Sequence, residues 1–251
     1  MNPAVDHFCL SGLTPCPRLK NRRLCIRPFS ATRCVQRDRQ ERRQGRRLGQ
    51  PTLRDARPVV VHSSAQASKA KIIGIAGGPP NNINEIKTAG EFGVTKGGQQ
   101  MVALLALITD IHSLGLQAAQ GLRLTTSFYW DMDDKTREWS KRYFAKMKRM
   151  PTMWQAGVYS SVMNYLNAVK ASGTDEPLKV AAKMREKPIE DFFSRNGKLR
   201  EDGLMVHDLI LVQVKKPEES KYPWDYYRIL AHIPGEQAFG PPDPACPLVK
   251  H

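Results

Sequence analysis

Three aspartates lie close together in the stretch FYWDMDDKTREWSKRYFAKM (residues 128–147), where they could bind a metal ion, act as acids or cap a helix. A calcium loop that began at Asp131 would need a glutamate at its twelfth position, which is Arg142 here. Catalysis by paired carboxylates needs two acids held apart across a cleft, whereas Asp131, Asp133 and Asp134 are clustered. Carboxylates just before an amphipathic pattern are typical of a helix N-terminus. We therefore expect a strand end followed by a capped helix.

A second candidate for chemistry is the pair Asp110 and His112 in the stretch TDIH. Their side chains would share a face if this segment were extended, and they could then act as acid and base or bind a metal. Two ligands without a third make a weak metal site. The sequence contains no Gly-x-Ser-x-Gly elbow, no phosphate loop ending in Gly-Lys-Ser/Thr and no His-Glu-x-x-His. We therefore expect neither an enzyme nor a cofactor, and an α/β enzyme that uses Asp110 and His112 is a lesser alternative.

From residue 69 onward, apolar runs alternate with helical patterns. The expected strands are residues 70–78, 121–130, 208–215 and 226–233. Residues 101–111 could form a strand or a helix, and the preceding polar turn favours a strand. The expected helices are residues 83–94, the segment from Asp134 with a stripe of Trp139, Tyr143 and Met147, the segment capped by Thr152, and residues 176–187. Strands that alternate with helices indicate an α/β fold with a largely parallel sheet.

The helix that follows Pro151 has an apolar face. Its apolar residues recur at helical spacing before the segment ASGTDEP ends it, and we expect this face to be buried: Val158, Val162, Tyr165, Leu166 and Val169.

The front of the chain differs from the rest in charge. Residues 1–60 hold 13 Arg, 1 Lys and 4 acidic residues, so they carry a charge of +10 out of the +15 of the whole chain. Clustered arginines can neutralise the phosphates of a nucleic acid, but only Phe8 and Phe29 are aromatic here, so no stacking platform exists. The alternatives are a disordered tail and a segment that is not native to the following domain, and the abrupt change favours the last. We divide the chain into a disordered or non-native Arg-rich segment, residues 1–62, and a domain, residues 63–251.

The compartment is indicated by what the sequence lacks. No apolar stretch approaches the roughly 18 residues of a membrane span. The N-terminus has no charged start followed by an apolar run and a cleavage site, so as written the chain would remain in the cytoplasm. Four of the five cysteines lie in the front segment without a Cys-x-x-Cys pair, and Cys246 stands alone near the end.

The order of motifs resembles a known family. The stretches ASKAKIIGIAGG, INEIKTAGEFGV and AQGLRLTTSFYWDMDD, and above all residues 150–214, look like the C-terminal half of a substrate-binding protein of an ABC transporter, of the branched-chain amino acid (Leu/Ile/Val-binding) type. The resemblance covers about residues 65–250. It implies part of a type I periplasmic-binding-protein fold, in which two α/β lobes with parallel sheets close over a small ligand and three strands cross between the lobes.

The resemblance also implies a ligand site at the carboxyl ends of parallel strands. Asp110 would face the ligand's ammonium group, and Tyr129 and Trp130 would lie near a crossover. Turn residues or core aromatics explain the same positions equally well. The candidate ligand-binding residues are Gly77, Gly78, Asn81, Asn82, Asp110, Tyr129 and Trp130.

The family begins with a secretory signal and a first lobe, neither of which is visible in residues 1–62. The expected function is therefore that of a truncated solute-binding component for branched-chain amino acids or related amide ligands, periplasmic in the intact family member, with membrane permease subunits as partners. We expect exposed apolar faces and strand edges, poor ligand binding and low stability for the isolated chain. The rival hypothesis is a cytoplasmic nucleic-acid-associated protein that uses the Arg-rich segment, and we consider nucleic acid an unlikely partner.

Overall fold

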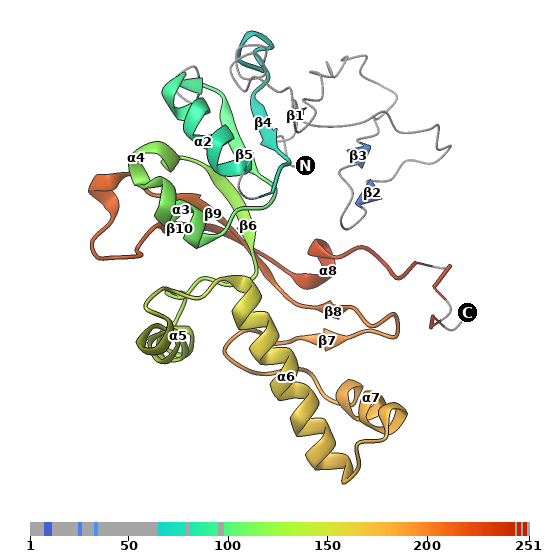
Figure 1. Ribbon diagram of the computed structural model, residues 1–251. Coiled ribbons are helices and arrows are strands. Elements are labelled where there is room, and N and C mark those ends of the chain that lie inside the picture. Colours follow the sequence, from blue (N-terminus) through green and yellow to red (C-terminus); the bar gives the residue numbers. More distant parts are fainter. Residues whose placement is uncertain are drawn as a thin grey trace. The chain divides into compact units, whose positions relative to one another are not determined.

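The computed structural model describes residues 65–78, 81–94, 98–243, 245–246 and 248–249, together with the backbone of three short strands nearer the N-terminus. These strands are β1 (Phe8–Ser11), β2 (Cys25–Ile26) and β3 (Arg33–Cys34), and β2 pairs with β3 in antiparallel fashion. The remainder of the expected Arg-rich segment, residues 1–62, lies outside the described residues, so the expectation that it is disordered or non-native stays a prediction. Figure 1 shows the arrangement of the elements.

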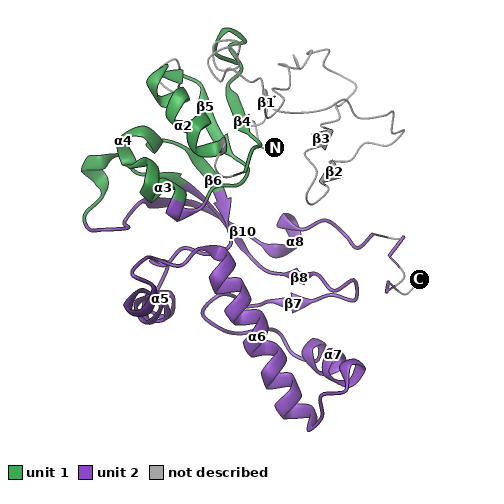
Figure 2. Ribbon diagram, viewed as in Figure 1, with its two compact units in different colours: residues 1–106, 110–124, 213–221 green, residues 107–109, 125–212, 222–251 purple. Residues whose placement is uncertain are grey.

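Two compact units divide the chain (Figure 2). Unit 1 comprises residues 1–106, 110–124 and 213–221, and unit 2 comprises residues 107–109, 125–212 and 222–251. Apart from the short piece 107–109, the chain passes from one unit to the other inside a strand at residues 124–125, inside another strand at residues 212–213, and at residues 221–222. Two of these passages lie inside strands, so the expectation that three strands cross between two lobes stays a prediction.

Unit 1 is built on a strand, helix, strand motif. The expected strand in residues 70–78 is β4 (Ile72–Ile75), which is followed by α2 (Asn81–Glu91) and β5 (Gln100–Ala103). β4 pairs with β5 in parallel, with Ile75 opposite Ala103, and β1 pairs in parallel with the other edge of β4. Parallel strands joined by a helix are covered on their faces, and Ile73, Ile75 and Ala103 are accordingly buried.

The helices of unit 1 approach one another at a glycine. α2 contacts α4 (Leu116–Ala119), and a Cβ atom added to Gly90 would lie 3.1 Å from the carbonyl oxygen of Ala118. Glycine at this position therefore permits a close contact between the two helices that any side chain would widen.

The expectation of one continuous strand over residues 101–111 was wrong. β5 ends at Ala103, a bend follows at Leu104 and Leu105, and α3 (Ile108–Leu114) then begins. Both pieces are apolar and buried, so the apolar run alone could not distinguish a strand from a helix. In the folded chain the run forms one strand and one helix.

A six-stranded sheet contains most of the remaining strands. Its order is β1-β4-β5-β6-β9-β10, with β6 (Arg123–Thr126), β9 (Leu209–Val214) and β10 (Tyr227–Ile233), and β5 pairs with β6 in parallel. The alternating burial along β9 leaves Ile210, Val212 and Val214 almost wholly covered. The fold is therefore α/β with a sheet in which parallel pairs predominate, as the sequence predicts.

Unit 2 holds three of the four expected helices. They are α5 (Asp134–Met147), α6 (Met153–Ser172) and α7 (Pro177–Arg185), and all three begin at or near the residues that the sequence indicates. The hairpin of β7 (Lys198–Leu199) and β8 (Met205–Val206) and the short helix α8 (Gly235–Ala238) also belong to unit 2, whereas the short helix η2 (Pro217–Glu219) belongs to unit 1. Within the described part of the chain, a search of the helices found no candidate for crossing a membrane.

An aromatic cluster forms the core beneath α5. Trp139 stacks on Phe192 with ring centroids 4.3 Å apart, and Phe128 meets Trp139 edge to face at 5.8 Å. The expected stripe on α5 is thus buried at Trp139 and stacked at Tyr143, whereas Met147 at its end is 49% exposed. Large rings packed in these geometries contribute beyond the area that they bury.

The buried face that we expected on α6 was wrong. Val158, Val162, Tyr165 and Leu166 are between 44% and 64% exposed, and the residues that α6 buries are instead Ala156, Ser160 and Ala168. The small residues bring the helix close to its neighbours, and the larger apolar residues point the other way. The sequence predicted the helical spacing of these apolar residues correctly, but within the described residues nothing covers the face that they form.

Candidate functional site

The loops that follow β4 and β5 lie at one edge of the sheet, because the two strands are parallel neighbours in register. Gly77 and Gly78 come directly after β4. Past the end of β5, the amide of Leu104 donates to the carbonyl oxygen of Ile75 at 2.9 Å, so the two loops start side by side. This is the edge at which open α/β sheets bind their ligands.

Asn82 ties these two loops together. It lies in the first turn of α2, its side chain is wholly buried, and its Nδ2 donates to the carbonyl oxygen of Leu105 in the loop after β5. Among the described residues, its Oδ1 has no hydrogen-bond partner. A buried amide oxygen without a donor is costly, so this atom has a physical reason to accept a further N–H or O–H group. The side chain of Asn81 lies outside the described residues.

Asp110 lies in the first turn of α3, close in sequence to the same edge, and is 8% exposed. Asp110 and His112 would share a face only in an extended segment, and that condition is not met, because the segment is helical and residues two apart in a helix do not face each other. His112 is exposed. The acid-base pair imagined from TDIH therefore loses the geometry on which it depended.

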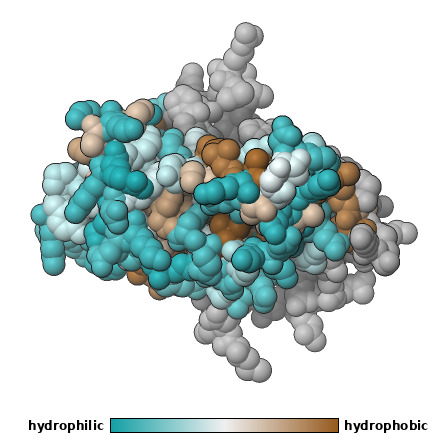
Figure 3. All heavy atoms as spheres, turned by 90° about the horizontal axis from the view of Figure 1, so that it is seen from below, coloured by the Kyte–Doolittle hydropathy of each residue, from teal (hydrophilic) through white to brown (hydrophobic). Residues whose placement is uncertain are grey.

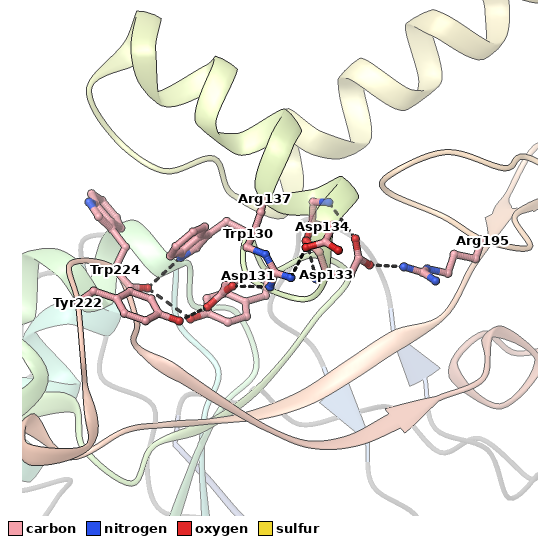
Figure 4. Close-up of polar contacts among 10 residues, drawn as sticks. Trp130, Asp131, Asp133, Asp134, Arg137, Arg195, Tyr222 and Trp224 are labelled. Atoms are coloured by element: carbon pink, nitrogen blue, oxygen red, sulfur yellow. Dashed lines mark hydrogen bonds and ion pairs between the residues drawn. The ribbon is translucent and has the colours of Figure 1, made fainter.

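Tyr129 and Trp130 are buried in unit 2, where both bind one carbonyl group (Figure 4). Trp130 Nε1 donates to the carbonyl oxygen of Trp224 at 2.9 Å, and the Tyr129 hydroxyl donates to the same oxygen at 3.4 Å. Burial, and then the charge of Asp225, raises the pKa of Tyr129, so its hydroxyl stays protonated and remains a donor. Both aromatic residues therefore hold a distant segment of the chain in place.

Asp131 connects the same segment to α5. It accepts a hydrogen bond from the Tyr222 hydroxyl through Oδ2 and forms an ion pair through Oδ1 with Arg137 at 2.8 Å. Arg137 also pairs with Asp134 at 2.7 Å, and these two carboxylates raise the pKa of the guanidinium group. The hydrogen bond to Asp131, followed by partial burial, raises the pKa of Tyr222 to about 12.

Asp133 caps α5, as the sequence predicts. Its Oδ1 accepts the amide of Thr136 at 3.0 Å, and the Thr136 hydroxyl accepts the amide of Asp133 at 3.0 Å. Its other oxygen pairs with Arg195. Burial opposes ionisation of this carboxyl, but the bonds from Thr136 and Arg195 outweigh burial and lower its pKa. Asp131, Asp133 and Asp134 thus each bind a neighbouring side chain or amide. These contacts favour a structural role for the three aspartates over metal binding or acid catalysis.

Metal binding finds no support elsewhere in the part of the chain that the structure describes, where no three His, Cys, Asp or Glu side chains gather into a possible site. The structure brings Gly77, Gly78, Asn82 and Asp110 into unit 1, near the ends of β4 and β5. Tyr129 and Trp130 belong to unit 2. The predicted site residues therefore fall into two groups. Those in unit 1 lie near a sheet edge that suits ligand binding, whereas Tyr129 and Trp130 hold the chain of unit 2 in place.

Sequence reasoning missed Tyr222 and Trp224. Both lie in the segment KPEESKYPWD between the last two expected strands, where Trp224 is 6% and Asp225 is 2% exposed. A tryptophan and a tyrosine that flank a proline in an otherwise charged loop were the available signal, because large aromatic residues are seldom left in water without a contact.

Known proteins resemble this chain in sequence and in fold. The sequence profile of the family described as "Periplasmic binding protein" matches residues 50–221. A periplasmic binding protein from Burkholderia mallei is 48% identical, with a TM-score of 0.69, over 76% of this chain and 51% of that one. A branched chain amino acid ABC transporter periplasmic ligand-binding protein from Burkholderia xenovorans LB400 is 45% identical, with a TM-score of 0.68, over 72% of this chain and 49% of that one.

More distant structures share the fold alone. A leucine binding protein from Thermotoga maritima MSB8 is 19% identical, with a TM-score of 0.56, over 70% of this chain and 48% of that one.

A search of the curated proteins found no match. This chain spans about half the length of the solved structures that it resembles. The family profile covers most of the chain, and the fold agrees with it, so the chain belongs to the periplasmic binding protein family.

Proposed function

We propose that this chain is part of the solute-binding component of an ABC transporter for branched-chain amino acids or related small amino-acid or amide ligands. The observation that carries the proposal is the 45% identity to the Burkholderia xenovorans protein for branched-chain amino acids, over 72% of this chain. The chain spans about half of that protein, so the complete activity depends on the other half as well.

The proposed ligand contacts lie at the edge formed by the ends of β4 and β5. Backbone groups around Gly77 and Gly78 can approach a ligand closely, since no side chain stands in the way. Asn81 is included from the sequence alone, whereas Asn82 lies in the first turn of α2 and its Oδ1 is an acceptor without a donor among the described residues. Asp110 supplies the negative charge that an ammonium group would seek. Tyr129 and Trp130 take a positioning role within unit 2, because their polar atoms already bind Trp224.

The proposed action is binding and delivery rather than catalysis. Members of this family are solute-binding proteins, and the complete protein would release its ligand to permease subunits in the membrane from the periplasmic side. The clustered aspartates support this view, because their bonds to Thr136, Arg137 and Arg195 stabilise α5 and leave no acid pair across a cleft.

The proposal can be tested with a chimaeric protein. Residues 65–249 of this chain would replace the aligned part of the Burkholderia xenovorans protein, and calorimetry would measure the binding of leucine, isoleucine and valine. Saturable binding of at least one of them is expected. The substitution Asp110→Asn should weaken it by roughly tenfold or more, because a buried ammonium group would lose its charged partner. His112→Gln, on the same helix but exposed, is the matched control and should leave affinity unchanged.

A chimaera that folds, as judged by circular dichroism and cooperative thermal unfolding, yet binds none of the three amino acids would contradict the proposed ligand class. Equal affinities for the Asp110→Asn variant and its parent would contradict the proposed contact alone.

A further inference from the structure

Helix α6 carries an uncovered apolar face, which we call the α6 stripe. Its members recur every three to four residues along 20 residues of helix, which places them on one side. Their exposed fractions run from 44% to 64%. The α6 stripe consists of Trp154, Val158, Val162, Tyr165 and Leu166. Figure 3 shows a face of the chain on which apolar residues are gathered in patches between polar ones.

The opposite side of α6 explains why the stripe faces outward. Ala156, Ser160 and Ala168 are at most 5% exposed, and α6 also contacts α7 (Figure 1). The Ser160 hydroxyl donates to Asp191 Oδ2 at 2.5 Å, and a Cβ atom on Gly157 would lie 3.5 Å from the ring of Phe193. These small residues allow a close contact that the residues of the stripe could not make, so the orientation of the helix is set by its packing within unit 2.

Strand β10, in the same unit, is also incompletely covered. It ends the strand order of the six-stranded sheet, so one of its edges has no neighbouring strand among the described residues. Tyr227 is its only buried residue, and Leu230 is 40% exposed. An open edge strand pairs readily with another strand, and a sheet of this type is normally covered on both faces.

The uncovered face of α6 and the open edge of β10 belong to one unit. A partner that covers both would have to supply an apolar layer and a strand. A peptide or a lipid surface would satisfy only one of these. The chain spans 51% and 49% of the two Burkholderia proteins, whose remaining parts have no counterpart in the matched region. We infer that the α6 stripe and the edge of β10 form the docking surface for that remaining half of the fold, and that the half binds here even when it is a separate polypeptide. The inference does not rest on which ligand the protein binds.

The experiment co-expresses the 251-residue chain with the part of the Burkholderia mallei protein that lies outside the match, carrying an affinity tag, without any added amino acid. The two chains should co-elute as a one-to-one complex in size-exclusion chromatography. Val158→Asp and Val162→Asp should each weaken the complex by more than about tenfold, since a carboxylate would enter an apolar contact. Asn167→Asp is the matched control, because it adds a similar charge at an exposed position of α6 outside the stripe, and it should leave the complex intact.

Both aspartate variants alter residues that are at least 50% exposed, so the fold of the chain should survive them, and circular dichroism would check this. Failure of the two halves to associate would overturn the inference. An association that both Val158→Asp and Val162→Asp leave unchanged would overturn it too, as would a homodimer that uses the stripe and excludes the added half. Because no amino acid is present, these results are independent of the ligand-binding test of the chimaera.

Discussion

At the scale of single residues, the carbonyl oxygen of Trp224 accepts hydrogen bonds from Trp130, Tyr129 and the amide of Tyr226. Trp224 has a φ of 69°, a conformation that costs energy for any residue other than glycine. The cost is offset by these three hydrogen bonds and by burial of the Trp224 ring. A residue that adopts an unfavourable conformation between two anchors fixes the path of the chain just after it re-enters unit 2.

Replacing Trp130 by phenylalanine tests the contribution of this hydrogen bond. The carbonyl of Trp224 would lose the bond from Trp130 and keep the bonds from the Tyr226 amide and the Tyr129 hydroxyl, and the free energy of unfolding should fall by about 1–2 kcal/mol. Urea unfolding of the complete chain would measure the change. Trp154→Phe, the same substitution at a position that is 51% exposed, should change it by less than about 0.5 kcal/mol. Equal losses in the two variants would show that ring size, rather than the hydrogen bond, matters.

Tyr222 offers a prediction about pH. Its pKa is raised from 10.0 to about 12, first by the hydrogen bond to Asp131, so the folded protein retains this proton where the unfolded chain has lost it. The resulting stability is fully present below pH 10 and is lost as the pH rises through 12. In Asp131→Asn the tyrosinate absorbance of Tyr222 should appear at lower pH. Tyr222→Phe, which lacks this titration, identifies the signal, and an unchanged titration in Asp131→Asn would refute the assignment.

At the scale of elements, α5 shows how a local signal determines a helix start. The capping box of Asp133 and Thr136 binds two amides of the first turn, and the ion pair with Arg195 links that turn to the segment after α7. The same carboxylate therefore stabilises both a helix and a contact distant in sequence.

Asp133→Ala should lower the free energy of unfolding by about 1 kcal/mol at neutral pH, because the first turn of α5 loses its cap. Folding lowers the pKa of Asp133 from its ordinary value of 3.8. The charged carboxylate therefore stabilises the fold fully at pH values above that ordinary pKa, and this stabilisation is lost as the pH falls through the folded pKa. The difference between the variant and the wild type should therefore narrow in acid, as followed by thermal unfolding. Glu138→Ala, at an exposed position of the same helix, should change stability little at either pH. A difference that stays constant with pH would contradict a role for the charge.

At the scale of the whole molecule, the chain combines a well-formed family fold with surfaces that fit an additional half. The solved relatives are about twice as long as the part that matches, and the α6 stripe and the edge of β10 remain uncovered in unit 2. Exposed apolar faces and open strand edges favour association and reduce stability.

The chain by itself should therefore bind leucine poorly and unfold readily. Calorimetry with the purified 251-residue chain is expected to give no saturable binding of leucine, and addition of the part of the Burkholderia mallei protein outside the match should raise the temperature of unfolding through mass action. Saturable leucine binding by the isolated chain would contradict this prediction.

Local chemistry allowed the sequence to predict most elements of this protein. The caps Asp133 and Thr152, the apolar run of β4 and the alternation of β9 all depend on neighbours within a few residues, so their signals are complete in the sequence itself. The position of Gly77, Gly78 and Asn82 beyond the carboxyl end of β4 also followed from the local pattern, whereas their contact with a ligand stays a prediction.

Contacts between distant residues decided the rest. Periodicity showed that α6 has an apolar face, but whether Val158 or Ala156 is covered depends on which elements are present to pack against each side. The break between β5 and α3 turned Asp110 and His112 onto different faces, and the bond from Trp130 to Trp224 joins residues 94 positions apart. A sequence pattern specifies which side chains avoid water, whereas only the tertiary structure determines what covers them, because that covering comes from residues far away in the chain.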